Sequence, residues 1–226
     1  MTDHVHAAKA ARQHTVYKLA DGKRVPGCTT ITGVMDKPAL KKWANRLGLQ
    51  GIEVEKYVDE LAVIGTLAHY MIECHCRKVT PDLGDYTPNQ ISIAENSYIK
   101  WMYWKDSVRF EPLHNELALV SEAHRFGGTL DIIGTVNGKL TLVDIKTCKG
   151  IYGEHKTQVA GGYGILADEN QKAIGGKIED IVICRVGRND EEGFESIQIS
   201  ATETKLHQRR FLICRELYEI NKEIGW

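Results

Sequence analysis

The clearest pattern of apolar and polar positions in the chain lies between residues 127 and 146. Two runs rich in β-branched and aliphatic side chains are separated there by Asn137-Gly138. An Asn-Gly pair between two such runs is the strongest short-range signal for a two-residue hairpin turn. The sequence therefore predicts two antiparallel strands, over residues 129–136 and 139–145, in which Val136 lies opposite Lys139.

Counting outward from this turn places Asp131 opposite Asp144. Because side chains alternate between the two faces of a strand, both acids share one face, and Lys146 lies on it two residues beyond Asp144. The residues predicted for that face are Thr129, Asp131, Ile133, Leu142, Asp144 and Lys146. Those predicted for the other face are Leu130, Ile132, Val143 and Ile145.

Two opposed acids in an apolar hairpin need a physical reason, because like charges about 5 Å apart destabilise a sheet. A divalent cation between them provides one, since carboxylate oxygens suit Mg²⁺ or Mn²⁺. Lys146 would then position a metal-bound water and stabilise charge that develops on a phosphate oxygen. In the alternative, the acids lie on a solvated sheet edge and Lys146 is a surface counter-charge. The apolar character of both strand faces argues against this alternative.

The rest of the chain alternates between helical and extended patterns. A short hairpin is expected over residues 17–30, around Asp21-Gly22. Helices are expected at residues 38–47, 52–78 with a bend or break near Gly65, 88–108, about 154–168 and 202–224, and strands at residues 115–123, 178–186 and 194–199. This order predicts an α/β fold with a central mixed sheet flanked by helices. The aromatic stripe in the third helix is expected to be core rather than a base-stacking surface, and consists of Trp101, Tyr103 and Trp104.

The composition fits one globular domain, with 226 residues of which 42% are hydrophobic and 26% are charged. No apolar run approaches the roughly 18 residues that span a bilayer, and residues 1–13 are expected to be a mobile leader without a signal-peptide core. We therefore expect a cytoplasmic protein with no membrane partner. The formal net charge is −1, but the first fifty residues carry nine Lys or Arg against three Asp. That local excess fits either a phosphate backbone or an ordinary solvated face.

The six cysteines are not spaced as ligands of a metal or an iron–sulfur cluster. They are Cys28, Cys74, Cys76, Cys148, Cys184 and Cys214. Cys74 and Cys76, which lie closest together, point in different directions on a helix. All six are therefore expected to be reduced thiols.

Five segments carry motifs in a fixed order. They are residues 17–48, residues 65–69 (GTLAH), residues 128–131 (GTLD), residues 144–146 (DIK), and the pair Gln158 and Tyr163. Together they resemble the PD-(D/E)XK nuclease superfamily, and within it the RecB-like, phage-type exonuclease branch, whose patterns are GxxxH, GxxD, DxK and QxxxY. Residues 17–48 are similar to the N-terminal segment of phage exonucleases and of the mitochondrial genome-maintenance exonuclease type. The resemblance covers about the first three quarters of the chain.

The sequence departs from the superfamily pattern at three places. Leu130 replaces the proline and Ile145 replaces the middle acidic residue, both as in the RecB-like branch. Gln158 and Tyr163 are five residues apart instead of four, which on a regular α-helix turns Tyr163 away from the face of Gln158. A π-bulge at Gly161-Gly162 would absorb the extra residue.

The resemblance implies one nuclease domain over residues 1–226, with an N-terminal extension at about 1–50 and a restriction-endonuclease-like core. Its implied catalytic residues are Asp131, Asp144 and Lys146. The implied ligands of Mg²⁺ or Mn²⁺ are His69, Asp131, Asp144 and the main-chain carbonyl of Ile145, with Glu116 assisting. Glu73, one turn after His69, is expected to orient the imidazole. The residues implied to contact substrate are Lys156, Gln158 and Tyr163.

The function expected from these features is a Mg²⁺-dependent DNA exonuclease of phage or prokaryotic DNA recombination and repair. Its expected partners are DNA and a single-strand annealing protein or another recombination protein. Two alternatives stay open: a structure- or sequence-specific DNA endonuclease, and a non-catalytic nucleic-acid-binding subunit that keeps the fold. The sequence leaves the oligomeric state open as well.

Overall fold

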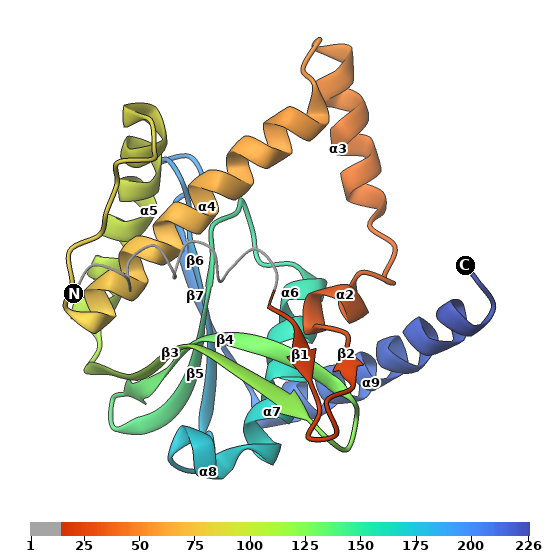
Figure 1. Cartoon of the computed structure of the whole chain (residues 1–226). Coiled ribbons are helices and arrows are strands. Elements are labelled where there is room, and N and C mark those ends of the chain that lie inside the picture. Colours follow the sequence, from red (N-terminus) through yellow and green to blue (C-terminus); the bar gives the residue numbers. More distant parts are fainter. Residues whose placement is uncertain (1–14) are drawn as a thin grey trace.

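The computed structural model describes residues 15–226 and is built around a five-stranded sheet (Figure 1). The strands lie in the order β3-β4-β5-β6-β7. They are β3 (Phe110–Ser121), β4 (Phe126–Val136), β5 (Lys139–Lys146), β6 (Asp180–Val186) and β7 (Phe194–Ile199). β5 and β6 pair in parallel, whereas the other neighbouring strands of this sheet pair antiparallel. The protein is therefore α/β with a central mixed sheet, as predicted.

Helices cover both faces of this sheet. The first face packs against α4 (Val54–Arg77) and α5 (Pro88–Ser107). The second face packs against a composite helix made of α6 (Gly153–Lys156), the π-helix η1 (Thr157–Tyr163) and α7 (Gly164–Glu169), and against α9 (Ala201–Glu223). The short α8 (Gln171–Ile174) connects α7 to β6. The chain thus crosses from β5 to β6 over the second face, as a parallel pair requires.

The aromatic stripe of α5 is only partly in the core. Trp101 and Trp104 are buried against the first face, as predicted. Tyr103 is 74% exposed, so the prediction is wrong for this residue. Tyr103 is two positions from Trp101, which on an α-helix is about 200° around the axis and therefore on the outer side.

The N-terminal segment packs against β3 and β4. β1 (Tyr17–Lys18) and β2 (Arg24–Val25) form the predicted hairpin around Asp21-Gly22. The hairpin is shorter than predicted, because a helix, α2 (Cys28–Thr32), follows it. The helix α3 (Pro38–Leu49) ends two residues later than expected. The leader predicted over residues 1–13 lies outside the described residues.

Of the bend or break predicted near Gly65, the break is wrong, because α4 continues through this residue without interruption. The structure gives the glycine a different role. A Cβ atom at Gly65 would lie 2.6 Å from Oγ1 of Thr147, which directly follows β5. Gly65 therefore lets α4 approach the end of the strand that carries Asp144 and Lys146.

The central hairpin has the predicted register at its turn. Val136 pairs with Lys139, and Asn137 and Gly138 have φ values of 52° and 84°. Positive φ at both positions is what a type I′ turn requires, and Asn-Gly tolerates it best. The paired ladder runs from this turn to Ile132 and Val143.

Beyond that pair the predicted alternation fails. Ile133 packs in the core of the second face and Ile132 in the core of the first face, as predicted, but Leu130 packs with Ile133 instead of with Ile132. The alternation therefore changes at Asp131. Across from it in β3, Glu116 has a φ of 51° and stands between two regular pairs. The regular pleat is interrupted at the same level in both strands.

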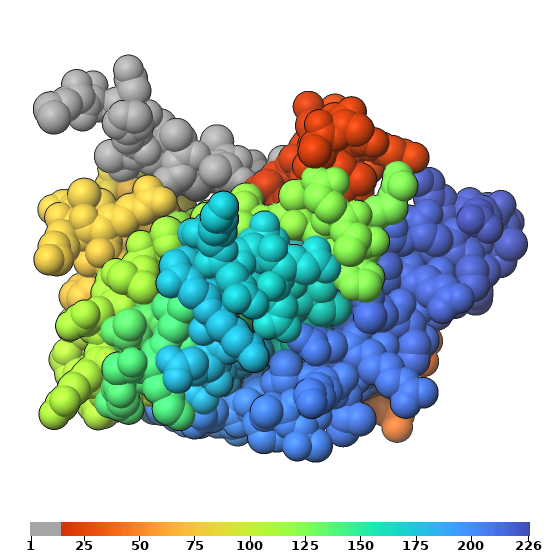
Figure 2. Space-filling model, turned by 90° about the horizontal axis from the view of Figure 1, so that it is seen from below, coloured from red at the N-terminus to blue at the C-terminus, as the bar shows by residue number. Residues whose placement is uncertain are grey.

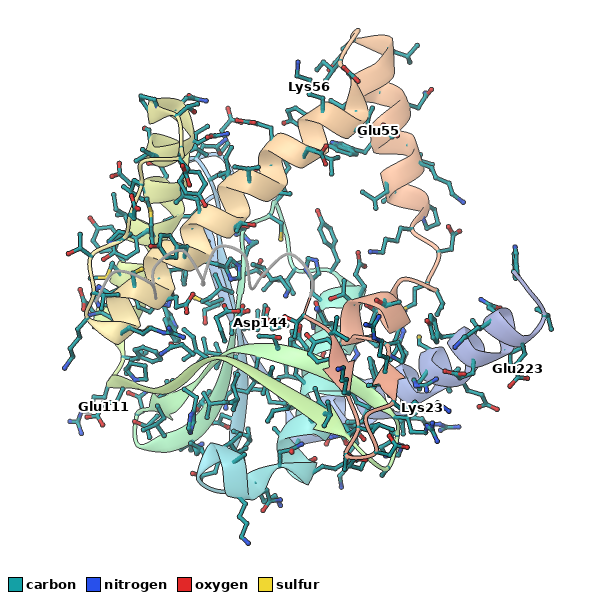
Figure 3. All side chains as sticks on the ribbon, viewed as in Figure 1. Lys23, Glu55, Lys56, Glu111, Asp144 and Glu223 are labelled. Atoms are coloured by element: carbon teal, nitrogen blue, oxygen red, sulfur yellow. The ribbon has the colours of Figure 1, made fainter. Side chains whose placement is uncertain are left out.

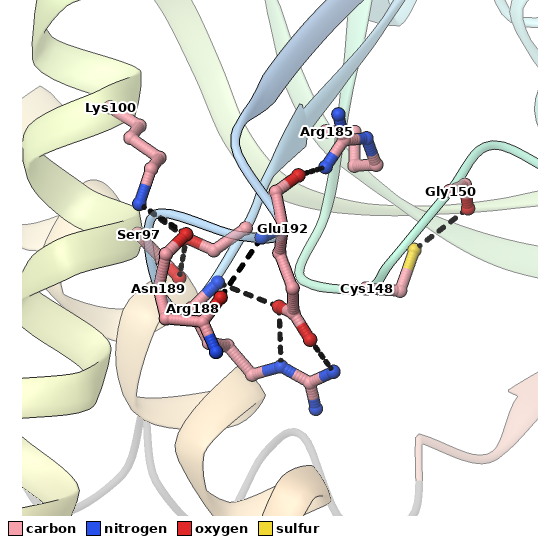
Figure 4. Close-up of polar contacts among 9 residues, drawn as sticks. Ser97, Lys100, Cys148, Gly150, Arg185, Arg188, Asn189 and Glu192 are labelled. Atoms are coloured by element: carbon pink, nitrogen blue, oxygen red, sulfur yellow. Dashed lines mark hydrogen bonds and ion pairs between the residues drawn. The ribbon is translucent and has the colours of Figure 1, made fainter.

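The turn between β6 and β7 is fixed to α5 and within itself (Figure 4). Ser97 and Lys100 donate hydrogen bonds to the carbonyl oxygen of Gly187, at 3.2 and 3.1 Å. Inside the turn, the Arg188 guanidinium pairs with Glu192 at 2.7 Å. These contacts anchor α5 to the sheet beside the C-terminal end of β5.

Candidate metal-binding and catalytic site

Three potential metal ligands converge from three different elements. His69 lies on α4, Glu116 on β3 and Asp131 on β4, and one ligand atom of each lies within 4.8 Å of the others. The distance between His69 Nδ1 and Asp131 Oδ2 is 3.5 Å. Imidazole nitrogen and carboxylate oxygens together suit a divalent transition ion such as Mn²⁺, and the carboxylates suit Mg²⁺. The group can therefore hold a cation between α4 and the sheet.

Glu116 occupies a strained backbone conformation in this group. Its φ of 51° lies in the left-handed region, which costs a non-glycine residue on the order of 1–3 kcal/mol. Such outliers persist where the surrounding structure holds them in place, and they gather at functional sites. The interrupted pleat directs the Glu116 carboxylate to the group that contains His69 and Asp131.

Asp144, on β5, forms the second half of the site, and Figure 3 shows it near the centre of the molecule. Its side chain is only 1% exposed, and Oδ2 lies 2.6 Å from Nζ of Lys146. Burial raises the pKa of the Asp144 carboxyl to about 7; the Lys146 charge opposes this rise and the Asp131 charge adds to it. Oδ2 has the Lys146 ammonium beside it but no well-aligned hydrogen bond. A buried carboxylate oxygen in this state is suited to a further positive partner.

The lysine of this pair stays charged. Burial by itself would lower the pKa of Lys146, but the charges of Asp144 and Asp131 outweigh burial and raise it. One ammonium thus stands against two carboxylates, Asp131 and Asp144, in a region of low solvent access.

Asp131 connects the two halves of the site. Its Oδ2 accepts a hydrogen bond of 2.8 Å from the backbone N–H of Ile145, and the same oxygen faces His69. The predicted picture of Asp131 and Asp144 as a flat cross-strand pair is therefore wrong, because the ladder ends at Ile132 and Asp131 bonds to the backbone of β5 instead. The two carboxylates remain neighbours, since each influences the charge of Lys146.

Glu73 lies on the same wall as His69. Both residues line a small cavity that also includes Asp131. The Glu73 carboxylate is buried and pairs with the Arg77 guanidinium at 2.8 Å. Glu73 thus brings a third carboxylate to this cavity, which Glu116 and Asp131 also line.

The π-helix brings Gln158 and Tyr163 together despite their spacing of five residues. Seven residues, Thr157–Tyr163, form η1, and Nε2 of Gln158 donates a hydrogen bond of 2.9 Å to Oη of Tyr163. Nε2 also donates to Oγ1 of Thr29 at 3.0 Å. The predicted absorption of the extra residue by a π-bulge is confirmed, because the wider turn of a π-helix places positions i and i+5 on one face.

Small residues make this arrangement possible. A Cβ at Gly128 would lie 2.8 Å from the Tyr163 ring, and a Cβ at Gly161 would lie 2.5 Å from the backbone oxygen of His207 on α9. Burial raises the pKa of the Tyr163 hydroxyl well above its usual range, and the charges of Asp144 and Asp131 add to this effect. The hydroxyl is therefore neutral, and it lies close enough to Asp144 and Asp131 for their charges to affect its pKa.

Lys156 is not part of this constellation. The resemblance implies that Lys156 contacts substrate beside Gln158 and Tyr163, whereas in the structure its ammonium pairs with Glu203 on α9 at 2.8 Å. Lys156 lies before the π-helix, two positions from Gln158, and therefore points in a different direction. It links α6 to α9.

Two residues near the site were missed from the sequence. His155 has its pKa lowered to about 4 by burial and by the nearby charge of Lys146, so it is a neutral imidazole beside the catalytic candidates. Tyr17 shares a hydrogen bond of 2.9 Å with Thr129 on β4. The glycine at position 127 of β4 is the sequence feature that accompanies Tyr17, because a Cβ there would overlap the Tyr17 ring. No pattern in the sequence marks His155.

The cysteines take no part in this site. All six are free thiols, and within residues 15–226 no group of three or more potential metal ligands includes a cysteine. Also within this range, no helix is long and apolar enough to cross a membrane. Comparison of the chain with protein-family models and with curated proteins found no match.

Proposed function

We propose that the protein is a divalent-metal-dependent DNA exonuclease with a restriction-endonuclease-like core, acting in phage or prokaryotic DNA recombination or repair. The observation that carries this proposal is the Asp144 carboxyl, which is buried, has a pKa raised to about 7 and lies 2.6 Å from Lys146. The charge of Asp131 acts on Asp144, and Asp131 in turn belongs to the group of possible ligands with His69 and Glu116. The motif order described above supports the assignment to the RecB-like branch.

The donor set fits Mg²⁺ or Mn²⁺. Asp131 and Asp144 would hold the ion together with His69 and the main-chain carbonyl of Ile145, and Glu116 would assist. Of these residues, His69, Glu116 and Asp131 already lie with one ligand atom of each within 4.8 Å of the others. The buried Oδ2 of Asp144 without an aligned hydrogen bond is the feature that most favours a cation there. When bound, such an ion supplies a water of lowered pKa and positive charge against the phosphate oxygens.

The chain itself supplies position and charge. Lys146 remains an ammonium and would exchange its contact with Asp144 for contacts with the attacking water and a phosphate oxygen. Gln158 and Tyr163, which are held together by a hydrogen bond, would contact the DNA backbone. The buried surroundings of Asp144 exclude bulk water, which strengthens each electrostatic interaction with the reacting phosphate.

A nuclease assay on two substrates tests the proposal. End-labelled linear DNA and covalently closed circular DNA are incubated with the purified chain in Mg²⁺ or EDTA. We expect Mg²⁺-dependent digestion of the linear DNA from its ends, loss of this activity in Lys146→Ala, and full activity in the matched control Lys177→Ala, an exposed lysine before β6.

The other outcomes are informative as well. Rapid cutting of the closed circle would replace the exonuclease by an endonuclease at the same site. DNA binding without any Mg²⁺-dependent cutting would replace it by a non-catalytic binding subunit. Cutting that persists in Lys146→Ala would refute the proposed site.

A further inference from the structure

The outer side of α9 carries a series of exposed apolar side chains. Five apolar side chains, four on the helix and one directly after it, are between 40% and 69% exposed. They are Leu206, Ile213, Leu217, Ile220 and Ile224. From Arg215 to Trp226 no residue is buried. Figure 1 shows this last part of α9 extending past the body of the protein, and Figure 2 shows the blue C-terminal segment at one edge of the molecule.

The spacing of these side chains is that of a coiled-coil seam. They follow one another at intervals of seven, four, three and four residues, and Arg210 fills the gap in the first interval. Alternating intervals of three and four keep side chains on one narrow stripe, which is the stripe used by paired helices rather than by a helix that packs on a sheet. With a rise of about 1.5 Å per residue, the stripe is roughly 27 Å long.

The stripe is separate from the face that α9 uses inside the protein. Phe211 and Cys214 are the buried residues of α9 and pack in the core of the second face. Around the helix axis, Ile213 lies about 160° from Phe211 and about 100° from Cys214, and Leu217 lies about 120° from Phe211 and about 60° from Cys214. The inner face of α9 is therefore already satisfied, and the seam remains available to a second helix.

The charges beside the seam specify the partner. The positions that directly precede Arg210, Leu217 and Ile224 on one flank are Arg209, Glu216 and Glu223, all exposed. A second copy of α9 in the antiparallel direction, related by a two-fold axis, brings this flank against itself. With the two-fold axis near Arg215, Arg209 of each helix lies within two positions of Glu223 of the other, which gives two opposite-charge pairs against one like-charge approach of the two Glu216 side chains at the axis. A parallel copy would instead bring Arg210 against Arg210, and the two glutamates disfavour a nucleic acid at this flank.

We propose that α9 mediates association of two copies of this chain through an antiparallel helix pair. The two-fold axis lies near Arg215, so that Ile213 of one copy packs against Leu217 of the other and Leu206 packs against Ile224. This association is independent of the proposed nuclease function, because the seam lies on the outside of α9 and the helix contacts η1 with its other face.

Sedimentation velocity from 1 to 100 μM tests the association. We expect a dimer in this range, and a dissociation constant at least about 100-fold weaker in Leu217→Glu/Ile220→Glu. The matched control is Ile99→Glu/Tyr103→Glu, which places two acids on exposed apolar positions of α5 and should still dimerise. Circular dichroism checks that all three proteins keep their helix content.

Cross-linking through introduced cysteines tests the direction of the helices without relying on the acidic variant. Ile213→Cys and Leu217→Cys are oxidised separately and as a mixture, with the unchanged chain as background for its own thiols. An antiparallel pair gives a cross-linked product mainly in the mixture, containing one copy of each variant. A monomeric chain at 100 μM, a dimer that survives Leu217→Glu/Ile220→Glu, or efficient cross-linking within each single variant would overturn the proposal.

Discussion

Replacing Asp144 by asparagine should remove a pH dependence of stability from the metal-free protein. The folded state raises the pKa of this carboxyl from its ordinary value of 3.8 to about 7, mainly by burial. Below about pH 4 the carboxyl is protonated in both the folded and the unfolded chain, and the variant should have nearly the same stability as the original chain. Between pH 4 and 7 the folded chain keeps a proton that the unfolded chain releases, so stability of the original chain falls as pH rises.

The size of this loss follows from the difference between the two pKa values. It corresponds to an upper limit of roughly 4 kcal/mol, complete above pH 7. The asparagine side chain of the variant would carry no charge at any pH and would leave Lys146 with Asp131 as its counter-charge. We therefore expect Asp144→Asn to be more stable than the original chain at pH 7.5 in EDTA by about 1–4 kcal/mol.

Urea unfolding in EDTA at pH values from 4.5 to 8 measures this difference directly. Asp190→Asn, which removes an exposed carboxylate from the β6–β7 turn, is the control and should follow the original chain. Addition of Mg²⁺ or Mn²⁺ at pH 7.5 should stabilise the original chain more than Asp144→Asn, because an ionised carboxylate binds the cation more strongly than a neutral amide oxygen does. Parallel curves for the original chain and Asp144→Asn across this pH range would refute the reasoning.

Three further predictions concern the surroundings of the site. Gly65→Ala should lower the free energy of unfolding by about 1–3 kcal/mol and reduce the cleavage rate, because its Cβ would meet Thr147 Oγ1. Adding Thr147→Ala should recover both quantities, measured by urea unfolding and by a cleavage assay. If either is not recovered, the close approach is contradicted. Tyr163→Phe removes the acceptor of the Gln158 amide, so DNA affinity measured by fluorescence anisotropy should fall about fivefold; an unchanged affinity would remove this pair from the DNA contact. Lys156→Ala should keep the full cleavage rate and cost less than about 1 kcal/mol, since the ammonium pairs with Glu203; a lost cleavage rate would return Lys156 to the substrate-binding residues.

Local chemistry makes part of the fold predictable. Asn137-Gly138 determines its own turn type and therefore the register of the hairpin, because few residue pairs accept two successive positive φ angles. The π-helix is predictable for a similar reason. Gln158 and Tyr163 are one residue further apart than the motif requires, and a π-helix accommodates the extra residue. Gly161 and Gly162 lie in this π-helix, at positions where a Cβ would collide with α9.

Features that depend on tertiary contacts are harder to predict from the sequence. Strict alternation predicts Leu130 on the face of Ile132, but the interrupted pleat at Asp131 and Glu116 places Leu130 in the other core. The alternation of apolar and polar residues in one strand cannot predict this interruption, because it involves two neighbouring strands, β3 and β4. A glycine in a helical pattern predicts a break at Gly65, whereas this residue permits close approach of α4 to Thr147.

The candidate site is predictable in its residues and only partly in its geometry. Motif spacing indicates His69, Asp131, Asp144 and Lys146 together. The structure adds the hydrogen bond from Ile145 to Asp131 and the neutral His155 beside Lys146. It removes Lys156, whose direction depends on where the regular helix gives way to η1. Side-chain direction near an irregular helix is set by packing, and sequence spacing alone does not determine it.

The central claim is that Asp131 and Asp144 share a divalent cation beside Lys146. Anomalous diffraction from crystals soaked in Mn²⁺ tests it most directly. The account predicts one strong peak within about 2.5 Å of oxygens of both carboxylates and near the imidazole of His69, with the Lys146 ammonium moved off Asp144. The account is contradicted if the soaked crystals carry no peak between α4 and β5, or if the Mn²⁺ contacts only one of the two aspartates.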